Sequence, residues 1–200
     1  KKEINFNKEN YPDFKKKIIH LIVEREPENI DNDIQNKNDY KIRLNSIKRI
    51  QEQRDYIKKA LKNFSENDYI IHSDNDEIPN LEKFDLRQNK RKIVIFKQKL
   101  FYYKFDLIIK DIDWFGSKAC KIKHLNSISG LRAIKNKKYN RLRLDTLFSK
   151  NKFTDLKIVE EGGWHFSNLK TVDELERKLL NDENHFEYEI KKKSLSDLRK

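Results

Sequence analysis

The centre of the chain reads Tyr69-Ile70-Ile71-His72-Ser73-Asp74-Asn75-Asp76-Glu77-Ile78-Pro79. The short apolar run at its start is typical of a buried strand, and the carboxylates of Asp74, Asp76 and Glu77 follow directly. Like charges this close repel one another, so we expect a positive group among them. Because one residue separates Asp74 from Asp76, both can reach one ion, and their oxygens suit Mg²⁺ or Mn²⁺. The stretch predicts a divalent-metal site at the end of a strand, with a solvated acidic turn as the alternative.

The apolar pattern before this stretch predicts a strand followed by a helix. Residues 17–24 are apolar and short enough for a buried strand, and residues 28–40 are predicted to form a surface loop. The following side chains then recur at steps of three and four, which places them on one face of a helix that starts near Asn45: Ile47, Ile50, Arg54, Ile57, Leu61 and Phe64. Strand, helix, strand is the unit of a parallel sheet, so we expect an α/β fold.

The second half of the chain is predicted to complete the sheet and to end in a helix. Residues 92–96 and 100–109 are expected to be strands, 111–116 a turn and 122–135 a mainly helical region. Leu156–Val159 is predicted to be a short strand. Thr171 is the expected N-cap of a last helix, because Glu174 completes a capping box three residues later. We expect one domain over residues 1–170 and a helical extension packed on it over residues 171–200.

Composition narrows the class of protein. The chain has 200 residues, of which 36% are hydrophobic and 39% charged, with a formal net charge of +12. No apolar run is long enough to cross a bilayer, so no transmembrane segment is expected. The lysine excess is spread over every segment together with Asn and Ile, so we interpret it as codon bias and expect no nucleic-acid partner. The single cysteine, Cys120, excludes an intrachain disulfide and a cysteine-based zinc cluster, and is predicted to be a buried thiol.

A second group of candidate residues follows the predicted strand Leu156–Val159, where the chain reads Glu160-Glu161-Gly162-Gly163-Trp164-His165. Glycine allows a ligand to approach the backbone closely, which makes Gly163 a candidate for contacting a bound ligand. Trp164 offers a flat apolar face, and His165 is a possible metal ligand or proton carrier, although a lone histidine is more often structural. Because this segment and the acidic stretch both follow predicted strands, we expect them to open on the same edge of the sheet.

Three further candidates lie elsewhere in the chain. Arg54 falls on the apolar face of the predicted helix, where an unpaired guanidinium would be costly. It is therefore predicted to pair with a carboxylate of the acidic stretch or to reach a phosphate, with Gln53 beside it, and a snorkelling arginine at the helix edge is the alternative. Trp114 can stack on an acceptor sugar, as can Trp164, whereas most aromatic residues of segment 101–105 are expected to fill the core.

Together and in this order, the motifs resemble those of glycosyltransferase family seventeen, which includes the β-1,4-mannosyl-glycoprotein 4-β-N-acetylglucosaminyltransferase. The resemblance covers residues 6–187, and its matching pieces are Gln53-Arg54, Asp74-x-Asp76-Glu77-Ile78-Pro79, Tyr102-Tyr103, Trp114-x-Gly116, Arg132, Gly163-Trp164-His165-x-Ser167 and His185-x-Glu187. It implies a GT-A-like fold with a mixed central sheet flanked by helices, whose first strand would precede this sequence. It also implies inverting transfer from a UDP-linked donor, such as UDP-N-acetylglucosamine, to a glycan acceptor, with Mn²⁺ or Mg²⁺ held by the Asp-x-Asp motif.

For this reaction we assign the metal to Asp76 and, directly or through water, to Asp74, with His165 as a further ligand. Glu77, Glu161 and His165 are the candidates for the base that accepts the acceptor's hydroxyl proton, and the sequence does not choose among them. Two other functions stay open. A metal-dependent nuclease or phosphodiesterase would also suit clustered carboxylates on a positive chain, and a non-catalytic carbohydrate-binding module could hold a structural ion in the acidic turn.

Overall fold

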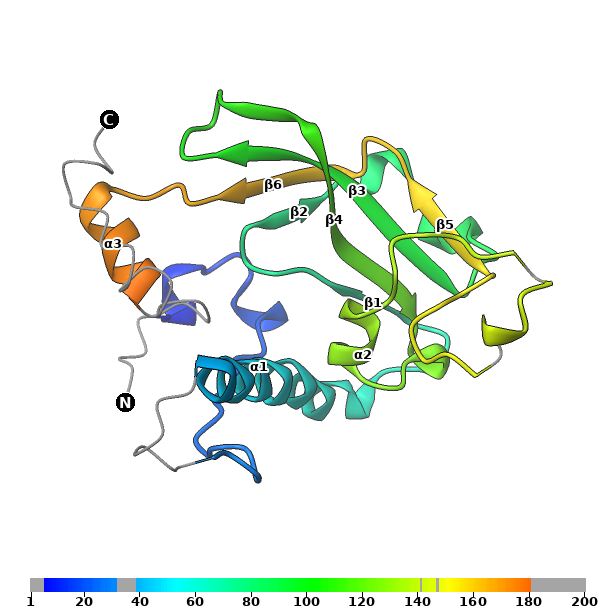
Figure 1. Ribbon diagram of the computed structural model, residues 1–200, viewed down its shortest axis with the longest axis horizontal. Coiled ribbons are helices and arrows are strands. Elements are labelled where there is room, and N and C mark those ends of the chain that lie inside the picture. The colour runs from blue at the N-terminus through cyan, green and yellow to red at the C-terminus, as the bar shows by residue number, and fades with distance from the viewer. Residues whose placement is uncertain (1–5, 32–38, 141, 147, 181–200) are drawn as a thin grey trace.

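The computed structural model describes residues 6–31, 39–140, 142–146 and 148–180. Its α-helices are α1 (Asp39–Tyr56), α2 (Ile128–Arg132) and α3 (Val172–Leu180). Its strands are β1 (Tyr69–His72), β2 (Glu77–Pro79), β3 (Ile93–Tyr102), β4 (Ile108–Lys121), β5 (Leu156–Val159) and β6 (Gly163–Ser167). Short 3₁₀ turns connect them at Lys8–Asn10, Lys15–Lys17, Ile57–Asn63 (η3), Leu81–Lys83 (η4), Leu86–Gln88 (η5), Ile122–His124 (η6) and Leu144–Thr146. The fold is of the α/β class, with one curled mixed sheet and few helices (Figure 1).

Strand β3 is the centre of the sheet, whose order is β1-β4-β3-β6-β2. On one side β3 pairs antiparallel with β4, and on the other side it pairs in parallel first with β5 and then with β6. Strand β2 pairs antiparallel with β6, which sets Glu77 opposite His165. The acidic stretch and the Gly-Trp-His segment therefore lie side by side, but as paired strands rather than as two loops that open on the same edge of the sheet, which the sequence predicted.

The sheet is curled because its two edge strands are close neighbours in the chain. Only residues 73–76 separate β1 from β2, although these strands occupy opposite edges of the sheet. In a flat sheet, four strand spacings would put these edges about 19 Å apart, near the limit of what so short a link can span. Contacts of β2 with β4, which is not its neighbour in the sheet, confirm the curl.

Two apolar layers cover the two faces of the sheet. Ile93 and Ile95 point to one face, where α2 and the residues after it add Leu131 and Ile134. Val94 and Phe96 point to the other face, which is covered by Phe84 and Leu86 from the segment between β2 and β3. This alternation follows from the pleat of a strand, in which successive side chains point to opposite faces. Cys120 is buried in the first layer as a free thiol, as predicted, and burial raises its pKa to about 11.

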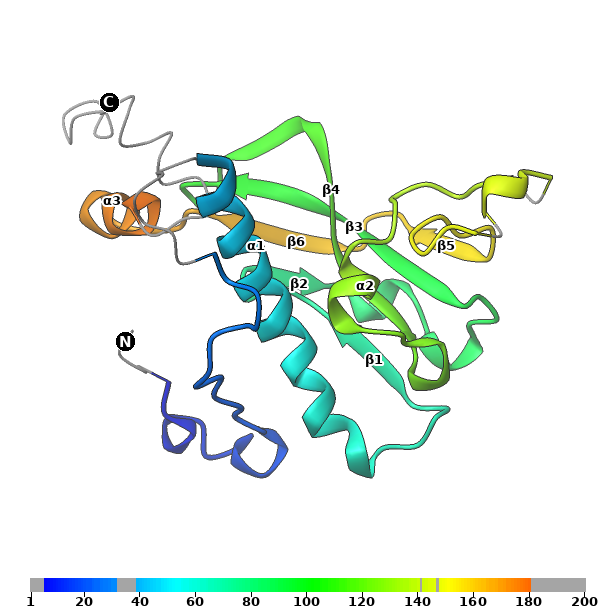
Figure 2. The ribbon, with the colours of Figure 1, turned by 60° about the horizontal axis from the view of Figure 1, so that its bottom comes forward.

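Helices α1 and α2 lie on the same face of the sheet (Figures 1 and 2). Asp55, near the end of α1, accepts hydrogen bonds from the backbone N–H (2.8 Å) and the hydroxyl (2.7 Å) of Ser129 in α2. This contact joins the C-terminal end of α1 to the start of α2. Arg54 of α1 and Arg132 of α2 therefore approach the acidic stretch from the same side.

Several predictions are wrong. Residues 17–24, which the structure describes, form no strand. Lys17 ends a 3₁₀ turn, and Ile19 and Ile22 are exposed rather than packed in a core. Strand β1 therefore has no parallel partner before it and pairs antiparallel with β4. The turn predicted over 111–116 lies inside β4, because the chain reverses at Tyr103, whose φ is +65°. Tyr103 and Phe105 are exposed rather than core residues.

Other predictions are confirmed wholly or in part. Strands form at Tyr69–His72 and at Leu156–Val159, and the predicted first helix is present but begins earlier, at Asp39. The Thr171 hydroxyl accepts from the N–H of Glu174 (3.3 Å), and the Glu174 carboxylate accepts from the N–H of Thr171 (3.0 Å), so the capping box is formed. Region 122–135 holds only η6 and α2 as helical elements. Residues 181–200 lie outside the described residues, and the division into 1–170 and 171–200 stays a prediction.

Gly163 should be essential for the pairing of β2 with β6. Its φ is +131°, and a Cβ at this position would lie 2.0 Å from the carbonyl oxygen of Ile78 on β2. We expect Gly163→Ala to lower the free energy of unfolding by about 2–4 kcal/mol, because it strains the backbone and separates the strands. Urea denaturation measures this loss. Gly130→Ala is the control, because its Cβ would meet the Ser127 side chain and no backbone atom, so its largest expected cost is the Ser127 cap of α2, about 1 kcal/mol. Equal losses in the two variants would contradict the prediction.

Candidate functional site

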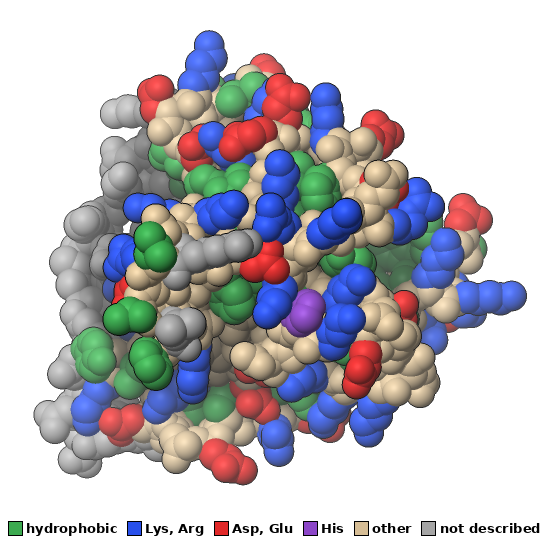
Figure 3. Space-filling view, turned by 90° about the vertical axis from the view of Figure 1, so that its right-hand side faces the viewer, with side chains coloured by type: hydrophobic (Ala, Val, Ile, Leu, Met, Phe, Trp, Pro, Cys, Tyr) green, Lys and Arg blue, Asp and Glu red, His purple; other side chains and the backbone are tan. Residues whose placement is uncertain are grey.

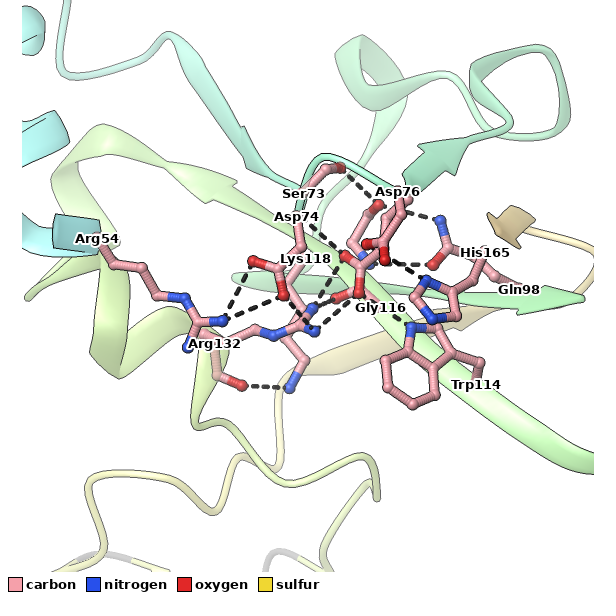
Figure 4. Close-up of polar contacts among 12 residues, drawn as sticks. Arg54, Ser73, Asp74, Asp76, Gln98, Trp114, Gly116, Lys118, Arg132 and His165 are labelled. Carbon is pink, nitrogen blue, oxygen red and sulfur yellow. Dashed lines mark hydrogen bonds and ion pairs between the residues drawn. The ribbon is translucent and has the colours of Figure 1, made fainter. Parts of the chain in front are cut away.

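A network of ion pairs lies where α1, α2 and the acidic stretch meet (Figure 4). Arg132, at the end of α2, lies 2.9 Å from a carboxylate oxygen of Asp74 and 2.7 Å from one of Glu77. Arg54, from α1, donates to both carboxylate oxygens of Asp74, at 3.2 and 3.1 Å. The positive groups expected beside the carboxylates are therefore two guanidinium groups. The pairing predicted for Arg54 is confirmed.

Glu77 is the most enclosed member of this network, because its side chain has no exposed surface. Its carboxylate accepts from both Nη atoms of Arg132 (3.0 and 2.7 Å), from the indole N–H of Trp114 (2.9 Å) and from the backbone N–H of Asp74 (3.1 Å). A buried carboxylate is stable only when it is paired and hydrogen-bonded in this way. This arrangement favours a role for Glu77 in positioning the site over the proton-accepting role considered from the sequence.

Gly116 provides the space in which Glu77 and Arg132 meet. A Cβ at residue 116 would lie 2.1 Å from the Gln98 side-chain oxygen and 2.6 Å from the carboxyl carbon of Glu77. Arg132 also donates to the carbonyl oxygen of Gly116, at 2.5 Å. Strand β4 therefore contributes backbone without a side chain at this point, which leaves room for the Glu77 carboxylate and the Arg132 guanidinium.

Asp76 faces His165. The Nδ1 atom of His165 lies 3.6 Å from Oδ1 of Asp76, and it is buried without a hydrogen-bond partner among the described residues. The indole of Trp114 stacks on the imidazole with a centroid distance of 4.2 Å and an interplanar angle of 7°, which fixes the ring. Burial lowers the pKa of His165 below its ordinary value, although the carboxylate of Asp76 acts in the opposite direction. A neutral imidazole is the form that can ligate a metal or accept a proton.

The site holds two donors that a divalent cation could use. No group of three or more His, Cys, Asp or Glu side chains within the described ranges is placed to hold a metal ion. The carboxylate of Asp74 is engaged by two arginines, whereas Asp76 faces only the imidazole of His165. Cations that serve phosphate chemistry often take one or two protein ligands and complete their shell with substrate oxygens and water. Asp76 and His165 fit that pattern, and the metal roles of Asp74, Asp76 and His165 stay predictions.

The remaining candidate residues surround this centre. Gln53 is exposed on α1, next to Arg54. Glu161 is exposed between β5 and β6, and its carboxylate lies 3.5 Å from the ammonium group of Lys83 rather than in the ion-pair network. Trp164 is 37% exposed on β6, so part of the residue is open to solvent, whereas Gly163 packs against the backbone of β2.

Lys118 is a member of the site that sequence reasoning missed. It is buried on β4, and its ammonium group donates to the carbonyl oxygens of Arg132 (2.7 Å) and Ile134 (2.5 Å). It therefore holds the chain at the end of α2, where the Arg132 side chain begins. Burial lowers the pKa of Lys118 to about 8, and the neighbouring charge of Arg132 acts in the same direction. No signal marked this residue, because lysine occurs in every segment of the chain.

Polar side chains also join β1, β3 and β4 beneath the acidic stretch. The hydroxyls of Ser73 and Ser117 are 2.6 Å apart, and the Gln98 amide donates to the Ser117 hydroxyl at 3.1 Å. His72, one residue before Ser73, is buried, and its Nδ1 has no hydrogen-bond partner in the described part of the chain. Burial lowers the pKa of His72. These contacts fix the end of β1, from which the acidic stretch emerges.

Comparison of the chain with protein-family models, with curated proteins and with solved structures finds no match in any of the three. None of the helices in the described ranges combines the length and the apolar character that crossing a membrane requires. The geometry of the site and the sequence motifs are therefore the basis for a functional proposal.

Loss of Glu77 should be severe, because it would leave Arg132 buried beside an empty position. We expect Glu77→Ala to lower the free energy of unfolding by about 3–5 kcal/mol. The double variant with Arg132→Met should lose less than the sum of the two single losses, because the charge and its partner are removed together. Chemical denaturation of the four proteins gives the coupling energy. Glu26→Ala, which removes an exposed ion pair with Arg49, should have little effect, and additive losses at Glu77 and Arg132 would contradict the prediction.

Lys118 and Cys120 should give stability opposite dependences on pH. The pKa of Lys118 is about 8 in the fold against an ordinary 10.5, so the unfolded chain binds more protons between these values and stability rises with pH there. The pKa of Cys120 rises from 9.0 to about 11, so its contribution to stability falls over that interval. We expect the wild type to gain stability from pH 8 to 9 and then to level off. Cys120→Ala should keep gaining to pH 10.5, by at most about 3 kcal/mol in total.

Urea denaturation at successive pH values measures these slopes. In a Cys120→Ala background, Lys118→Met should abolish the rise. A flat profile in Cys120→Ala alone, or a rise that persists after Lys118→Met, would show that Lys118 is not the titrating group.

Proposed function

We propose that this protein is an inverting, metal-dependent glycosyltransferase that transfers a sugar from a UDP-linked donor to a glycan acceptor. The observation that carries the proposal is the pairing of β2 with β6, which sets Asp76 of the Asp-x-Asp motif against the buried Nδ1 of His165, for which the described residues offer no hydrogen-bond partner. Two motifs far apart in the sequence thus converge on one point. Both belong to the set that resembles glycosyltransferase family seventeen, from which we take N-acetylglucosamine as the proposed sugar.

Mn²⁺ or Mg²⁺ is the proposed cofactor, with Asp76 and His165 as its protein ligands. When bound there, the ion would supply positive charge to the diphosphate leaving group as the bond to the sugar breaks. Asp74 has a different proposed role, because Arg54 and Arg132 hold its carboxylate. It keeps two guanidinium groups beside the motif, and the partly exposed Arg54 is placed to contact a donor phosphate.

The acceptor side is proposed to lie along β6. Trp164 exposes part of its indole to solvent one residue before His165, so it can stack on a sugar ring. Trp114 has another role, because it stacks on His165 and donates to Glu77. Glu161 and His165 stay the candidates for the proton acceptor, because the carboxylate of Glu77 is fully engaged by hydrogen-bond donors.

Asp76→Asn is the variant that tests the proposal. The wild type should gain thermal stability when Mn²⁺ and the correct UDP-sugar are added together, because a ligand that binds only the folded state stabilises it by about 2.7 kcal/mol at one hundred times its Kd. Asp76→Asn should lose this shift and the release of UDP in the presence of acceptor. Its melting temperature without ligand should stay close to that of the wild type, because Asp76 has no arginine partner among the described residues.

Glu82→Gln is the matched control, because Glu82 is an exposed carboxylate a short distance along the same segment. It should retain both the shift and UDP release. Metal-dependent transfer that survives Asp76→Asn would defeat the proposal. A wild type that is stabilised by RNA or DNA in a salt-sensitive manner, and by no nucleotide-sugar, would favour the nuclease instead.

A further inference from the structure

A basic surface covers the end of the sheet that lies away from the site. Strand β1 runs from this end, at Tyr69, toward the acidic stretch, and its partner β4 returns from Trp114 to Lys121. Figure 3 shows lysine and arginine side chains gathered around a histidine on the side of the molecule that includes this end. We define the basic surface by residues of η3, η6 and the ends of β3 and β4, namely Lys58, Lys59, Lys62, Lys92, Lys121 and Lys123.

The charges of this surface have neutral neighbours. Lys58 donates to the carbonyl oxygen of Asn126 (2.7 Å), and Lys123 donates to the side-chain oxygen of Asn67 (2.8 Å). Lys59 and Lys121 lie over tyrosine rings, at 3.8 and 5.7 Å from the centroids. None of these four partners is a carboxylate. Three acids lie at this end: Glu66, whose backbone oxygen accepts from Lys123, Asp68, which accepts from Ser65, and Asp155, which accepts from Arg91 and Lys92. The six lysines outnumber them, so the surface keeps a net positive charge.

Burial and the charges of three of these lysines lower the pKa of a neighbouring histidine, His124. The pKa of His124 is lowered first by burial and then by the charges of Lys92, Lys123 and Lys121, with Asp155 opposing them. Lys92, Lys121 and Lys123 therefore lie near one another, although they are separate in the sequence.

The basic surface also contains an apolar hollow. A groove of about 370 Å³ is lined by the aliphatic side chains of Leu61, Ile122 and Leu125 and by lysines 58, 59 and 62 of η3. Phe64, at the end of η3, is 52% exposed, and Ile57, at its start, is 37% exposed. Apolar side chains that stay in water beside lysines are typical of segments that lie at a membrane interface.

We propose that the basic surface docks on an anionic lipid bilayer. Its charge is complementary to phosphatidylserine-type head groups. Phe64 and the apolar side chains of the groove would insert at the boundary between the head groups and the acyl chains. A nucleic-acid partner would explain fewer features of this surface. A phosphate backbone would make no use of the groove or of Phe64, and lysines lie over the rings of Tyr56 and Tyr69, on which bases would otherwise stack. The proposal goes beyond the glycosyltransferase function and does not depend on it.

Vesicle co-sedimentation tests the proposal with the full chain. The protein should bind vesicles of phosphatidylcholine with about one-third phosphatidylserine and should not bind phosphatidylcholine alone, and rising salt should weaken binding. Each lysine near such a surface contributes about fivefold in affinity, so Lys58→Glu/Lys62→Glu/Lys123→Glu should bind about 100-fold more weakly or worse. Phe64→Ser should lose the part of the binding that survives at high salt.

The matched control is Lys99→Glu/Lys104→Glu/Lys110→Glu, which makes the same charge change at exposed positions on and beside the β3–β4 hairpin. It should lose less than about tenfold, because those lysines lie away from the bilayer. Circular dichroism and thermal melting should show both triple variants folded, and Phe64→Ser supplies a second readout without a charge change. Failure of the wild type to bind anionic vesicles, equal losses in the two triple variants, or displacement of the vesicles by a lower concentration of RNA would each overturn the proposal.

Discussion

The buried contact between Glu77 and Arg132 is the constraint on which the rest of this architecture depends. A carboxylate without exposed surface is expensive unless donors surround it, and here the donors come from α2, from β4 and from the backbone of the acidic stretch itself. The contact joins β2 to α2, and both partners are also bonded to β4, Glu77 by the indole of Trp114 and Arg132 by the carbonyl oxygen of Gly116. Strands β2 and β4 are not neighbours in the sheet, so these bonds hold the sheet in its curled form. The contact also explains why Gly116 has no side chain and why Lys118 is buried behind Arg132.

The same contact divides the acidic stretch into two parts with different environments. Asp74 and Glu77 are neutralised by arginines, whereas Asp76 faces the imidazole of His165. Three carboxylates that would repel one another in an extended chain thereby have different partners. Asp74 and Glu77 fix the geometry, and Asp76 is left with a buried nitrogen opposite it. A proposal of metal-assisted transfer rests on this separation rather than on the Asp-x-Asp pattern alone, which occurs often by chance.

Local patterns predicted what local forces decide. The capping box at Thr171, the strand that ends at His72 and the need for a partner at Arg54 follow from neighbouring residues, and all three are present. The strand predicted over residues 17–24 is absent, because a short apolar run has no periodicity that distinguishes a buried strand from an irregular segment. The long β3–β4 hairpin was misplaced because its aromatic residues continue past the turn at Tyr103. Lys118 could not be found, since its partners are backbone carbonyls that only the tertiary fold brings to it.

The shortness of the two outer strands has a consequence for behaviour at high concentration. An exposed strand edge is a template on which a second molecule can add, and the hazard grows with the length of the free edge. Here β1 spans only Tyr69–His72 and β2 only Glu77–Pro79, and the proline that ends β2 has no N–H to offer. At β1 and β2, therefore, little free edge is open to a second molecule, which limits edge-to-edge addition at these two strands.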